Sequence, residues 1–392
     1  MVQKHESTQE TLGIYFHASP ATINVVPHSQ QNHMNLTDLG YDEFFESARM
    51  QAGLGACAVA RVTAEHRGAY RVLNETGERV AKITGKQMYQ ASSQEEYPAV
   101  GDWVAITELD AEQAVIHGAL TRRTVLKRRE SGGDGTQVIA ANVDVACIVQ
   151  AVGRDFNINR FERYAAVVSA GGVQPSFILN KADLLPSSDI DAMVSHITAR
   201  LPDVPVIAVS TRTTQGLDTF VARLEKGKTY CFVGSSGVGK SSLINVLLGD
   251  AVLATKEVGS QTNRGTHVTT ARTLFVLDTG VMVIDNPGVR ELGILEADAG
   301  LEHVFDTIAE IESSCKFPDC THSNEPKCAI RKALESGTMD PEQYESYMKL
   351  KRENEFHAMS DLERRRKDHA FGKYIKKTLS DISRRDEAGG VE

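Results

Sequence analysis

Residues 229–242, with the sequence TYCFVGSSGVGKSS, decide the fold of this chain. An apolar run leads into the pattern G-x-x-x-x-G-K-[ST], and an apolar helical stretch follows it. A strand, a glycine-rich loop and a helix in this order predict a phosphate-binding loop, whose backbone N–H groups surround the phosphates of a nucleotide. We expect Lys240 to reach the β and γ phosphates and the Ser241 hydroxyl to ligate Mg²⁺. The residues assigned to this loop are Gly234, Ser235, Ser236, Gly237, Val238, Gly239, Lys240, Ser241 and Ser242.

The segments before this loop predict the fold class. From Val143 to Val233, short apolar strands alternate with helical stretches, as in a parallel α/β sheet with crossover helices. Between Gly53 and Val125, five short alternating segments with glycine-rich turns predict a small β-barrel of the OB type. The polar segment from Lys127 to Thr136 is expected to link the two.

The four residues Asn180-Lys181-Ala182-Asp183 predict which base is bound. A carboxylate at Asp183 can accept both the N1 hydrogen and the exocyclic amine of guanine, whereas adenine lacks this donor pair. Asn180 would support the loop, and the aliphatic stem of Lys181 would cover the base. The motif follows an apolar strand, and ligands bind at the carboxyl ends of parallel strands. Ser210 ends a second predicted strand and is expected beside the base.

The stretch MVIDNPG, residues 282–288, resembles the strand-D-x-P-G element of GTPases. Asp285 would hold Mg²⁺ through water, and the Gly288 N–H would contact the γ-phosphate and couple its presence to the following loop. Because Asn180 precedes Gly234, the base motif comes before the phosphate loop, the reverse of the usual order. The sequence therefore predicts a circularly permuted GTPase fold.

The group that positions the attacking water must come from another segment. The position after the D-x-P-G glycine, where Ras-like proteins carry glutamine, is Val289, which cannot form a hydrogen bond. The first switch belongs between the phosphate loop and Asp285. There, Thr269 is the candidate Mg²⁺ and γ-phosphate contact, and His267 is the candidate water-positioning residue. An exposed loop histidine without a catalytic role is the alternative.

Three cysteines and a histidine form the pattern C-x₄-C-x-H-x₅-C: Cys315, Cys320, His322 and Cys328. This set supplies all four ligands of a closed tetrahedral zinc site, which predicts a structural ion and not a hydrolytic one. Unrelated buried cysteines are the alternative. Cys57, Cys147 and Cys231 lie within predicted strands and are expected to be packing residues.

Composition narrows the class of protein. The chain has 392 residues, enough for two or three domains, and no stretch long and apolar enough to predict a membrane span. The polar N-terminus lacks a secretory signal, so a cytoplasmic location is expected. A formal charge of −9 excludes a uniformly basic protein that coats nucleic acid.

The predicted boundaries are a largely flexible N-terminal extension (1–50), an OB barrel (51–126), a permuted GTPase domain (136–300), a helical zinc-binding domain (301–370) and a C-terminal tail (371–392). Trp103, the single tryptophan, would pack in the barrel in preference to stacking on a base. The basic run between Lys349 and Lys377 is either an RNA contact or a solvated helix face.

The permuted motifs, the preceding barrel and the run CKFPDCTHSNEPKCA (315–329) together resemble the bacterial small-ribosomal-subunit biogenesis GTPase family RsgA, also called YjeQ. The resemblance implies hydrolysis of GTP to GDP with Mg²⁺, one structural Zn²⁺ per chain, and a role in late maturation of the 30S ribosomal subunit. It also implies stimulation of hydrolysis by that subunit. We expect a monomer that contacts 16S rRNA and no membrane. The family's switch reads G-x-H-T-T-T, so Val268 and Asn286, which replaces the threonine of D-T-P-G, are departures from its pattern.

Two other functions compete with this interpretation. One is a nucleotide-gated rRNA-binding scaffold with negligible hydrolysis, which Val289 and Val268 favour. The other is a P-loop kinase that phosphorylates a small substrate, but it leaves the base motif and the cysteine cluster unexplained.

Overall fold

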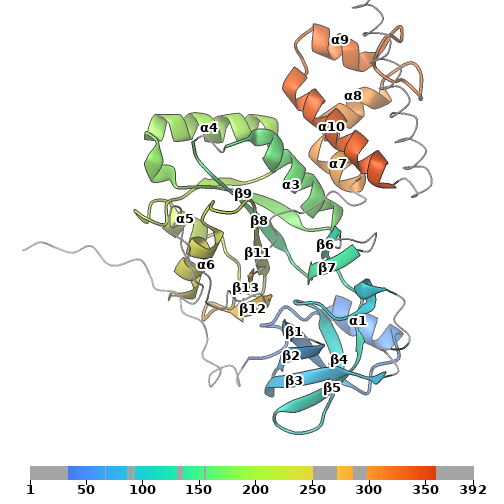
Figure 1. Cartoon of the computed structure of the whole chain (residues 1–392), viewed down its shortest axis with the longest axis vertical. Coiled ribbons are helices and arrows are strands. Elements are labelled where there is room, and N and C mark those ends of the chain that lie inside the picture. Colours follow the sequence, from blue (N-terminus) through green and yellow to red (C-terminus); the bar gives the residue numbers. More distant parts are fainter. Residues whose placement is uncertain are drawn as a thin grey trace, which may run out of the picture.

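The computed structural model describes residues 34–66, 68–85, 89, 93–129, 136–153, 156–249, 272–285 and 298–358. Its described part consists of a β-barrel, a central α/β region and a helical C-terminal module, in that order along the long axis (Figure 1). Among the described residues, no helix is long and apolar enough to cross a membrane.

The barrel is built from five strands, and the predicted OB-type fold is confirmed. Its strands are β1 (Ala58–His66), β2 (Ala69–Asn74), β3 (Gly77–Ile83), β4 (Trp103–Glu108) and β5 (Gln113–Ala119). The pairing β1–β2–β3–β5–β4 closes because β4 also pairs with β1. A separate core of small and branched side chains, including Val62, Val72 and Ile106, fills it. A short 3-10 turn, Gln94–Glu96, precedes β4.

Part of the segment predicted as a flexible extension is folded. Helix α1 (Glu43–Gln51) is capped by the Asp42 side chain and buries Phe45. The Phe45 and Tyr41 rings pack against Trp103, with ring centroids 5.9 and 4.8 Å away. Trp103 is fully buried, so its predicted packing role is confirmed. The aromatic contacts explain why this segment folds against the barrel.

The predicted linker is also partly structured. Its first residues belong to β6 (Val125–Arg129), and Thr136 begins β7 (Thr136–Ala141), with which β6 pairs antiparallel. Lys127 forms an ion pair with Glu95, and Thr136 donates a hydrogen bond to the same carboxylate. These contacts hold the polar ends of the segment in a hairpin.

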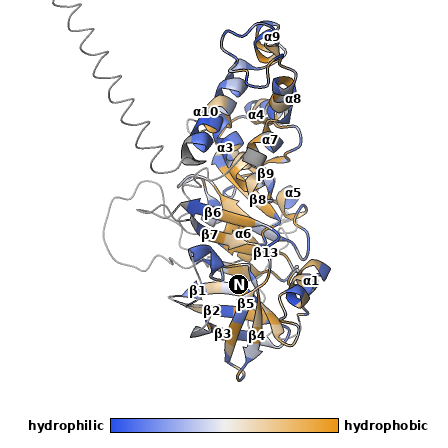
Figure 2. Ribbon diagram, turned by 90° about the vertical axis from the view of Figure 1, so that its right-hand side faces the viewer, coloured by the Kyte–Doolittle hydropathy of each residue, from blue (hydrophilic) through white to orange (hydrophobic). Residues whose placement is uncertain are grey.

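The predicted α/β sheet is confirmed. Parallel strands run in the order β10 (Val206–Ala208), β9 (Gln174–Asn180), β8 (Val145–Ala151), β11 (Thr229–Val233) and β13 (Met282–Asp285). Antiparallel β12 (Thr273–Val276) follows and pairs with β1 of the barrel, which joins both parts in one sheet. Most residues of these strands are apolar and buried, as expected for a parallel sheet with helices on both faces (Figure 2).

Helices cover the two faces of this sheet. Residues of α3 (Ile158–Ala170) and α4 (Ser187–Arg200) pack with Ile148 on one face. Residues of α5 (Leu217–Val221) and α6 (Lys240–Leu248) pack with Val149 on the other. A short 3-10 turn, Ala182–Leu184, follows β9. The result is a three-layer α/β core.

The C-terminal module consists of α7 (Asp298–Val304), α8 (Asp306–Ser313), α9 (Ala329–Glu335) and α10 (Pro341–Ala358). It docks on α3. At Gly300 of α7, an added Cβ would lie 2.0 Å from the Ala166 carbonyl oxygen, so only glycine allows this approach. Arg163 of α3 forms a bidentate ion pair with Glu353 of α10, at 2.7 and 2.8 Å.

Arg61 joins the barrel to the α/β core. Its buried guanidinium donates hydrogen bonds to the carbonyl oxygens of Leu39, Gly101 and Asn142 and to the Thr229 hydroxyl. Burial lowers the pKa of Arg61 to about 10, and the charges of Asp144 and Asp102 oppose the shift.

We expect Arg61→Leu to lower the free energy of unfolding by about 2–4 kcal/mol, because it leaves buried acceptors without donors. Urea unfolding followed by the fluorescence of Trp103, whose ring lies 5.6 Å from the guanidinium, would measure this. Arg71→Ala on β2 is the control. Arg71 is about half exposed and pairs with Glu78, so its loss should change stability by less than about 1 kcal/mol. Equal effects of the two changes would contradict the role given to Arg61.

Candidate functional site

The predicted phosphate loop connects β11 to α6 at the carboxyl edge of the sheet. All five residues of β11 are buried. Gly234 has φ +136°, and a Cβ there would lie 2.3 Å from the Val149 carbonyl oxygen of β8. Gly239, at φ +98°, precedes the first residue of α6. Glycine is therefore required at both ends of the loop for steric reasons.

Lys240 lies over the start of its own loop. Its Nζ donates to the carbonyl oxygens of Gly234 and Ser235, at 2.7 Å each. Ser241 and Ser242 follow in the first turn of α6 and are half-buried. Asp285 ends β13, beside β11. Burial raises the pKa of Asp285 above its ordinary value, and the charge of Lys240 opposes this shift.

The predicted base motif contacts the phosphate loop directly. Asn180, the last residue of β9, is fully buried, and its Nδ2 donates to the Val238 carbonyl oxygen at 2.8 Å. A Cβ on Gly239 would lie 2.2 Å from the same Nδ2. The Lys181 backbone adopts a left-handed conformation, and its Nζ donates to the Gly237 carbonyl oxygen at 2.8 Å. The two motifs are thus held together although they are far apart in sequence.

Ser210 lies against Asp183. Its hydroxyl donates to Asp183 Oδ1 at 2.5 Å, and its oxygen accepts the backbone N–H groups of Arg212 and Thr213. Sequence reasoning placed Ser210 beside the base. In the structure its hydroxyl holds the carboxylate that is predicted to bind the base, and its own place beside the base stays a prediction. Ala182 is buried, and its N–H donates to the Val209 carbonyl oxygen, which fixes the base loop to the next strand.

Several predicted residues lie outside the described part of the chain. They are the catalytic candidates His267 and Gly288, the Mg²⁺ candidate Thr269, and the departures Val268, Asn286 and Val289. Their roles stay predictions.

The predicted metal ligands do come together. The ligand atoms of Cys315, Cys320, His322 and Cys328 all lie within 4.8 Å of one another. His322 Nδ1 lies 3.7 Å from Cys315 Sγ and 3.4 Å from Cys328 Sγ, and these two sulfurs are 3.9 Å apart. Edges of this length suit a tetrahedron with metal–sulfur bonds of about 2.3 Å. The cluster could hold a metal ion.

Backbone N–H groups donate to two sulfurs of this cluster. The N–H of Ala329 donates to Cys315 Sγ at 3.3 Å, and that of Arg331 donates to Cys328 Sγ at 3.5 Å. Outside the cluster, Cys147 and Cys231 are buried in the sheet, which confirms their packing role. Burial raises the pKa of Cys231 to about 12. Cys57 is half-buried and lies directly before β1.

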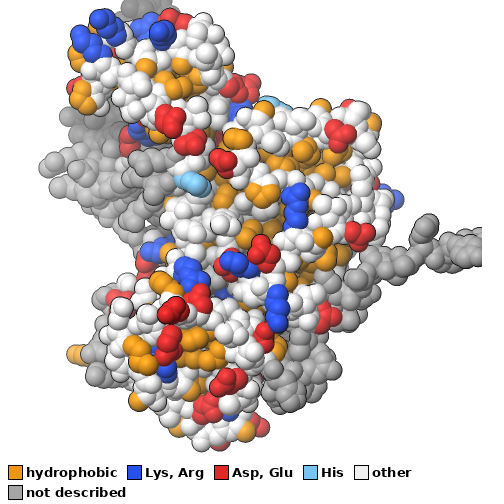
Figure 3. Space-filling view, turned by 180° about the vertical axis from the view of Figure 1, so that it is seen from behind, with side chains coloured by type: hydrophobic (Ala, Val, Ile, Leu, Met, Phe, Trp, Pro, Cys, Tyr) orange, Lys and Arg blue, Asp and Glu red, His pale blue; other side chains and the backbone are white. Residues whose placement is uncertain are grey.

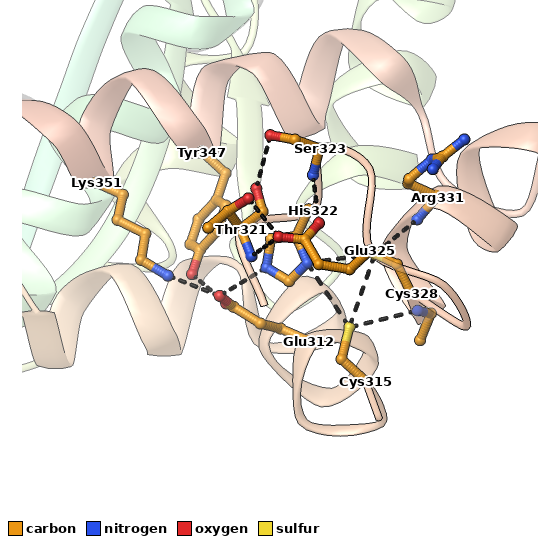
Figure 4. A network of polar contacts seen from close by, with 11 residues as sticks. Glu312, Cys315, Thr321, His322, Ser323, Glu325, Cys328, Arg331, Tyr347 and Lys351 are labelled. Atoms are coloured by element: carbon orange, nitrogen blue, oxygen red, sulfur yellow. Dashed lines mark hydrogen bonds and ion pairs between the residues drawn. The ribbon is translucent and has the colours of Figure 1, made fainter. Parts of the chain in front are cut away.

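Glu312 is the neighbour that sequence reasoning missed. Its Oε1 lies 3.0 Å from His322 Nε2 and 2.7 Å from Lys351 Nζ, and its Oε2 accepts the Tyr347 hydroxyl at 2.8 Å (Figure 4). Burial opposes ionisation, but the hydrogen bonds from Lys351, His322 and Tyr347 lower the pKa of Glu312 to about 2. The carboxylate therefore directs Nδ1 of His322 toward the sulfurs. The signal in the sequence that could have indicated Glu312 is the spacing of Tyr347 and Lys351. These two polar side chains are four residues apart on one helix face and can bind the same acceptor.

Comparison with known proteins is consistent with these features. A model of the RsgA GTPase family matches residues 119–295. The small ribosomal subunit biogenesis GTPase RsgA 2 of Lactiplantibacillus plantarum is 42% identical over 80% of this chain and 89% of its own length. RsgA of Opitutus terrae is 40% identical over 83% of this chain and 91% of its own length.

Two solved structures are similar to this chain. The crystal structure of YjeQ from Thermotoga maritima has a TM-score of 0.57 and 26% identity, and the match covers 74% of this chain and 96% of YjeQ. YloQ, described as a circularly permuted GTPase, has a TM-score of 0.56 and 23% identity, covering 78% and 97%. The likeness to YloQ concerns the fold alone.

Replacing Glu312 by glutamine tests its part in metal binding. We expect Glu312→Gln to keep one metal ion per chain but to weaken Zn²⁺ affinity about 10- to 100-fold, because the amide orients His322 less strongly. Competition with a chromophoric chelator measures this affinity. Glu325→Gln is the matched control, because Glu325 accepts hydrogen bonds from Thr321 and Ser323 but from no metal ligand. Unchanged affinity in Glu312→Gln would rule out this role.

Proposed function

This chain belongs to the RsgA family of GTPases, and from that premise we propose that it binds the small ribosomal subunit, assists late 30S maturation and hydrolyses GTP to GDP with stimulation by that subunit. One observation carries the proposal. The base motif and the phosphate loop, which are in permuted order along the chain, are joined through Asn180 and Val238 into a single nucleotide site.

Guanine is the base that this site fits. Asp183 is held by Ser210 through Oδ1, and Nη1 of the exposed Arg212 lies 4.0 Å from Oδ2. The carboxylate is therefore oriented but not neutralised by a close ion pair, and it can accept the two N–H donors of guanine. Lys181, anchored on Gly237, supplies an aliphatic surface for the base.

The phosphates would bind along Gly234 to Ser242, with Lys240 moving from the loop carbonyls to the β and γ phosphates. Mg²⁺, when bound with GTP, neutralises charge on the transferred phosphoryl group. Ser241 and Thr269 would hold it directly, and Asp285 through water. Gly288 would contact the γ-phosphate, and His267 would position the attacking water. The scaffold without hydrolysis is disfavoured because the family is one of GTPases.

The cysteine cluster would hold Zn²⁺ with a structural role. Three thiolates and one imidazole complete the tetrahedron, so no position is open for a reacting water. The ion would tie the loop between α8 and α9 to the helices of the module. A P-loop kinase gives no reason for this cluster.

Contact with 16S rRNA would use the barrel and the C-terminal module. OB barrels bind RNA through their groove and loops. In the module, Lys316, Lys327 and Lys332 are exposed around the metal cluster. Lys and Arg side chains gather at the tip of the module in the view from behind (Figure 3). We propose that the chain acts on the subunit as a monomer in the cytoplasm.

The proposed function is tested by measuring GTP hydrolysis with and without purified 30S subunits. We expect at least a tenfold stimulation, because the family role couples hydrolysis to the subunit. His267→Ala should abolish the stimulated rate and keep GTP affinity within about twofold, since this residue would act on water and not on binding. A rate that is the same with and without subunits would defeat the proposal, and full turnover by His267→Ala would remove the histidine from it.

Asp183→Asn tests the base contact separately. The amide presents a donor where guanine needs an acceptor, so GTP affinity should fall by at least 100-fold while XTP, which carries a carbonyl at that position, should be bound. Fluorescent nucleotide titration measures both. Arg212→Ala, which changes only the exposed neighbour of Asp183, should leave the preference for GTP intact. Tight GTP binding by Asp183→Asn would contradict the assignment.

A further inference from the structure

Arg160 brings a second positive charge to the phosphate loop. It lies in the first turn of α3, which begins after Asn157, whose side chain caps the helix by accepting the Arg160 N–H. Helix α3 follows β8, and β8 pairs with β11, the strand that leads into the loop. The Arg160 Nη1 donates to the Ser235 hydroxyl at 3.2 Å. Nothing in the phosphate-loop or base motifs signals this contact.

The charge of Arg160 has no carboxylate partner within the described ranges. Two neighbouring arginines differ in this respect. Arg163, on the same helix, pairs with Glu353, and Arg200 of α4 pairs with buried Glu162. Arg160 is half-buried and contacts a neutral hydroxyl. A half-buried guanidinium with free N–H donors next to a phosphate loop is suited to a phosphate oxygen.

Contacts along the loop indicate which phosphate Arg160 would meet. The base motif touches the later half of the loop, through Gly237 and Val238. Lys240 and Arg160 both touch Ser235, in the first half: Lys240 at the carbonyl oxygen and Arg160 at the hydroxyl. Since the base marks one end of the nucleotide and this lysine serves the β and γ phosphates, Ser235 lies toward the outer phosphates.

We propose that Arg160 binds the γ-phosphate of GTP and thereby strengthens binding of GTP relative to GDP. This inference rests on the proposed GTPase function and adds a residue to it. The guanidinium would stay near Ser235 and turn its free N–H groups to the γ-phosphate oxygens. Helix α3 holds it in place, because Gln150 hydrogen-bonds both the N–H and the carbonyl oxygen of Asn157, and Glu162 pairs with Arg200.

The test compares affinities for GDP and for a non-hydrolysable GTP analogue by calorimetry. Arg160→Gln should weaken binding of the analogue about tenfold, or ~1.4 kcal/mol, and change GDP affinity by less than about twofold. Arg160→Lys keeps the charge but not the planar guanidinium. Its affinity for the analogue should lie between those of the unmodified chain and Arg160→Gln. Arg163→Gln is the matched control: it removes a cation from the same helix, away from the loop, and should leave the analogue-to-GDP ratio unchanged.

Each other outcome counts against the inference. Equal weakening of both nucleotides in Arg160→Gln would mean that Arg160 only supports the loop through Ser235. An unchanged ratio, or the same change in Arg163→Gln, would also overturn it. Thermal unfolding of each variant with GDP shows that it is folded. Failure of the proposed function is distinguishable, because then the unmodified chain would not bind or hydrolyse GTP.

Discussion

The hydrogen bond from the Asn180 amide to the Val238 carbonyl oxygen is the constraint on which the nucleotide site depends. It joins the strand that carries the base motif to the loop that carries the phosphate motif, and it leaves no room for a Cβ at Gly239. Asn180 is fully buried, so its amide must be satisfied within the protein, and its Oδ1 accepts the Lys181 N–H. Permutation changes the order of the motifs along the chain and preserves this contact, because the contact joins the end of β9 to the loop after β11 at the same edge of the sheet, with β8 between the two strands.

Helix α3 gives this site a physical connection to the C-terminal module. Its first turn carries Arg160 beside Ser235, and its middle carries Arg163, which is paired with Glu353 of α10. The same α10 carries Tyr347 and Lys351, which hold Glu312 and through it His322. Helix α3 therefore connects the phosphate loop to the C-terminal module through ion pairs and hydrogen bonds, in addition to the connection along the chain.

The sequence alone was sufficient to predict the elements that depend on a local pattern of residue types. The phosphate loop, the five barrel strands and the cysteine–histidine cluster each depend on residue types at fixed spacing, and those spacings are visible without the fold. Contacts between distant segments were not predictable in this way. Glu312 contacts Tyr347 and Lys351 because the fold brings α8 and α10 together. The short segment before the barrel folds because Phe45 packs against Trp103. The polar residues Lys127 and Thr136 were predicted to lie in a flexible linker. Both belong to strands, because the Lys127 charge and the Thr136 hydroxyl are satisfied by one distant carboxylate, Glu95.

Arg61 shows why the barrel and the nucleotide domain act as one structure. The guanidinium comes from β1, and among its acceptors is Thr229, the first residue of the strand that ends at the phosphate loop. Strand β1 also pairs with β12, whose neighbour β13 ends at Asp285. An RNA-bound barrel would thus be connected by backbone hydrogen bonds to the two strands, β11 and β13, that carry the phosphate loop and Asp285. The barrel and the C-terminal module therefore reach the phosphate loop by different routes, the barrel through paired strands and the module through helix α3.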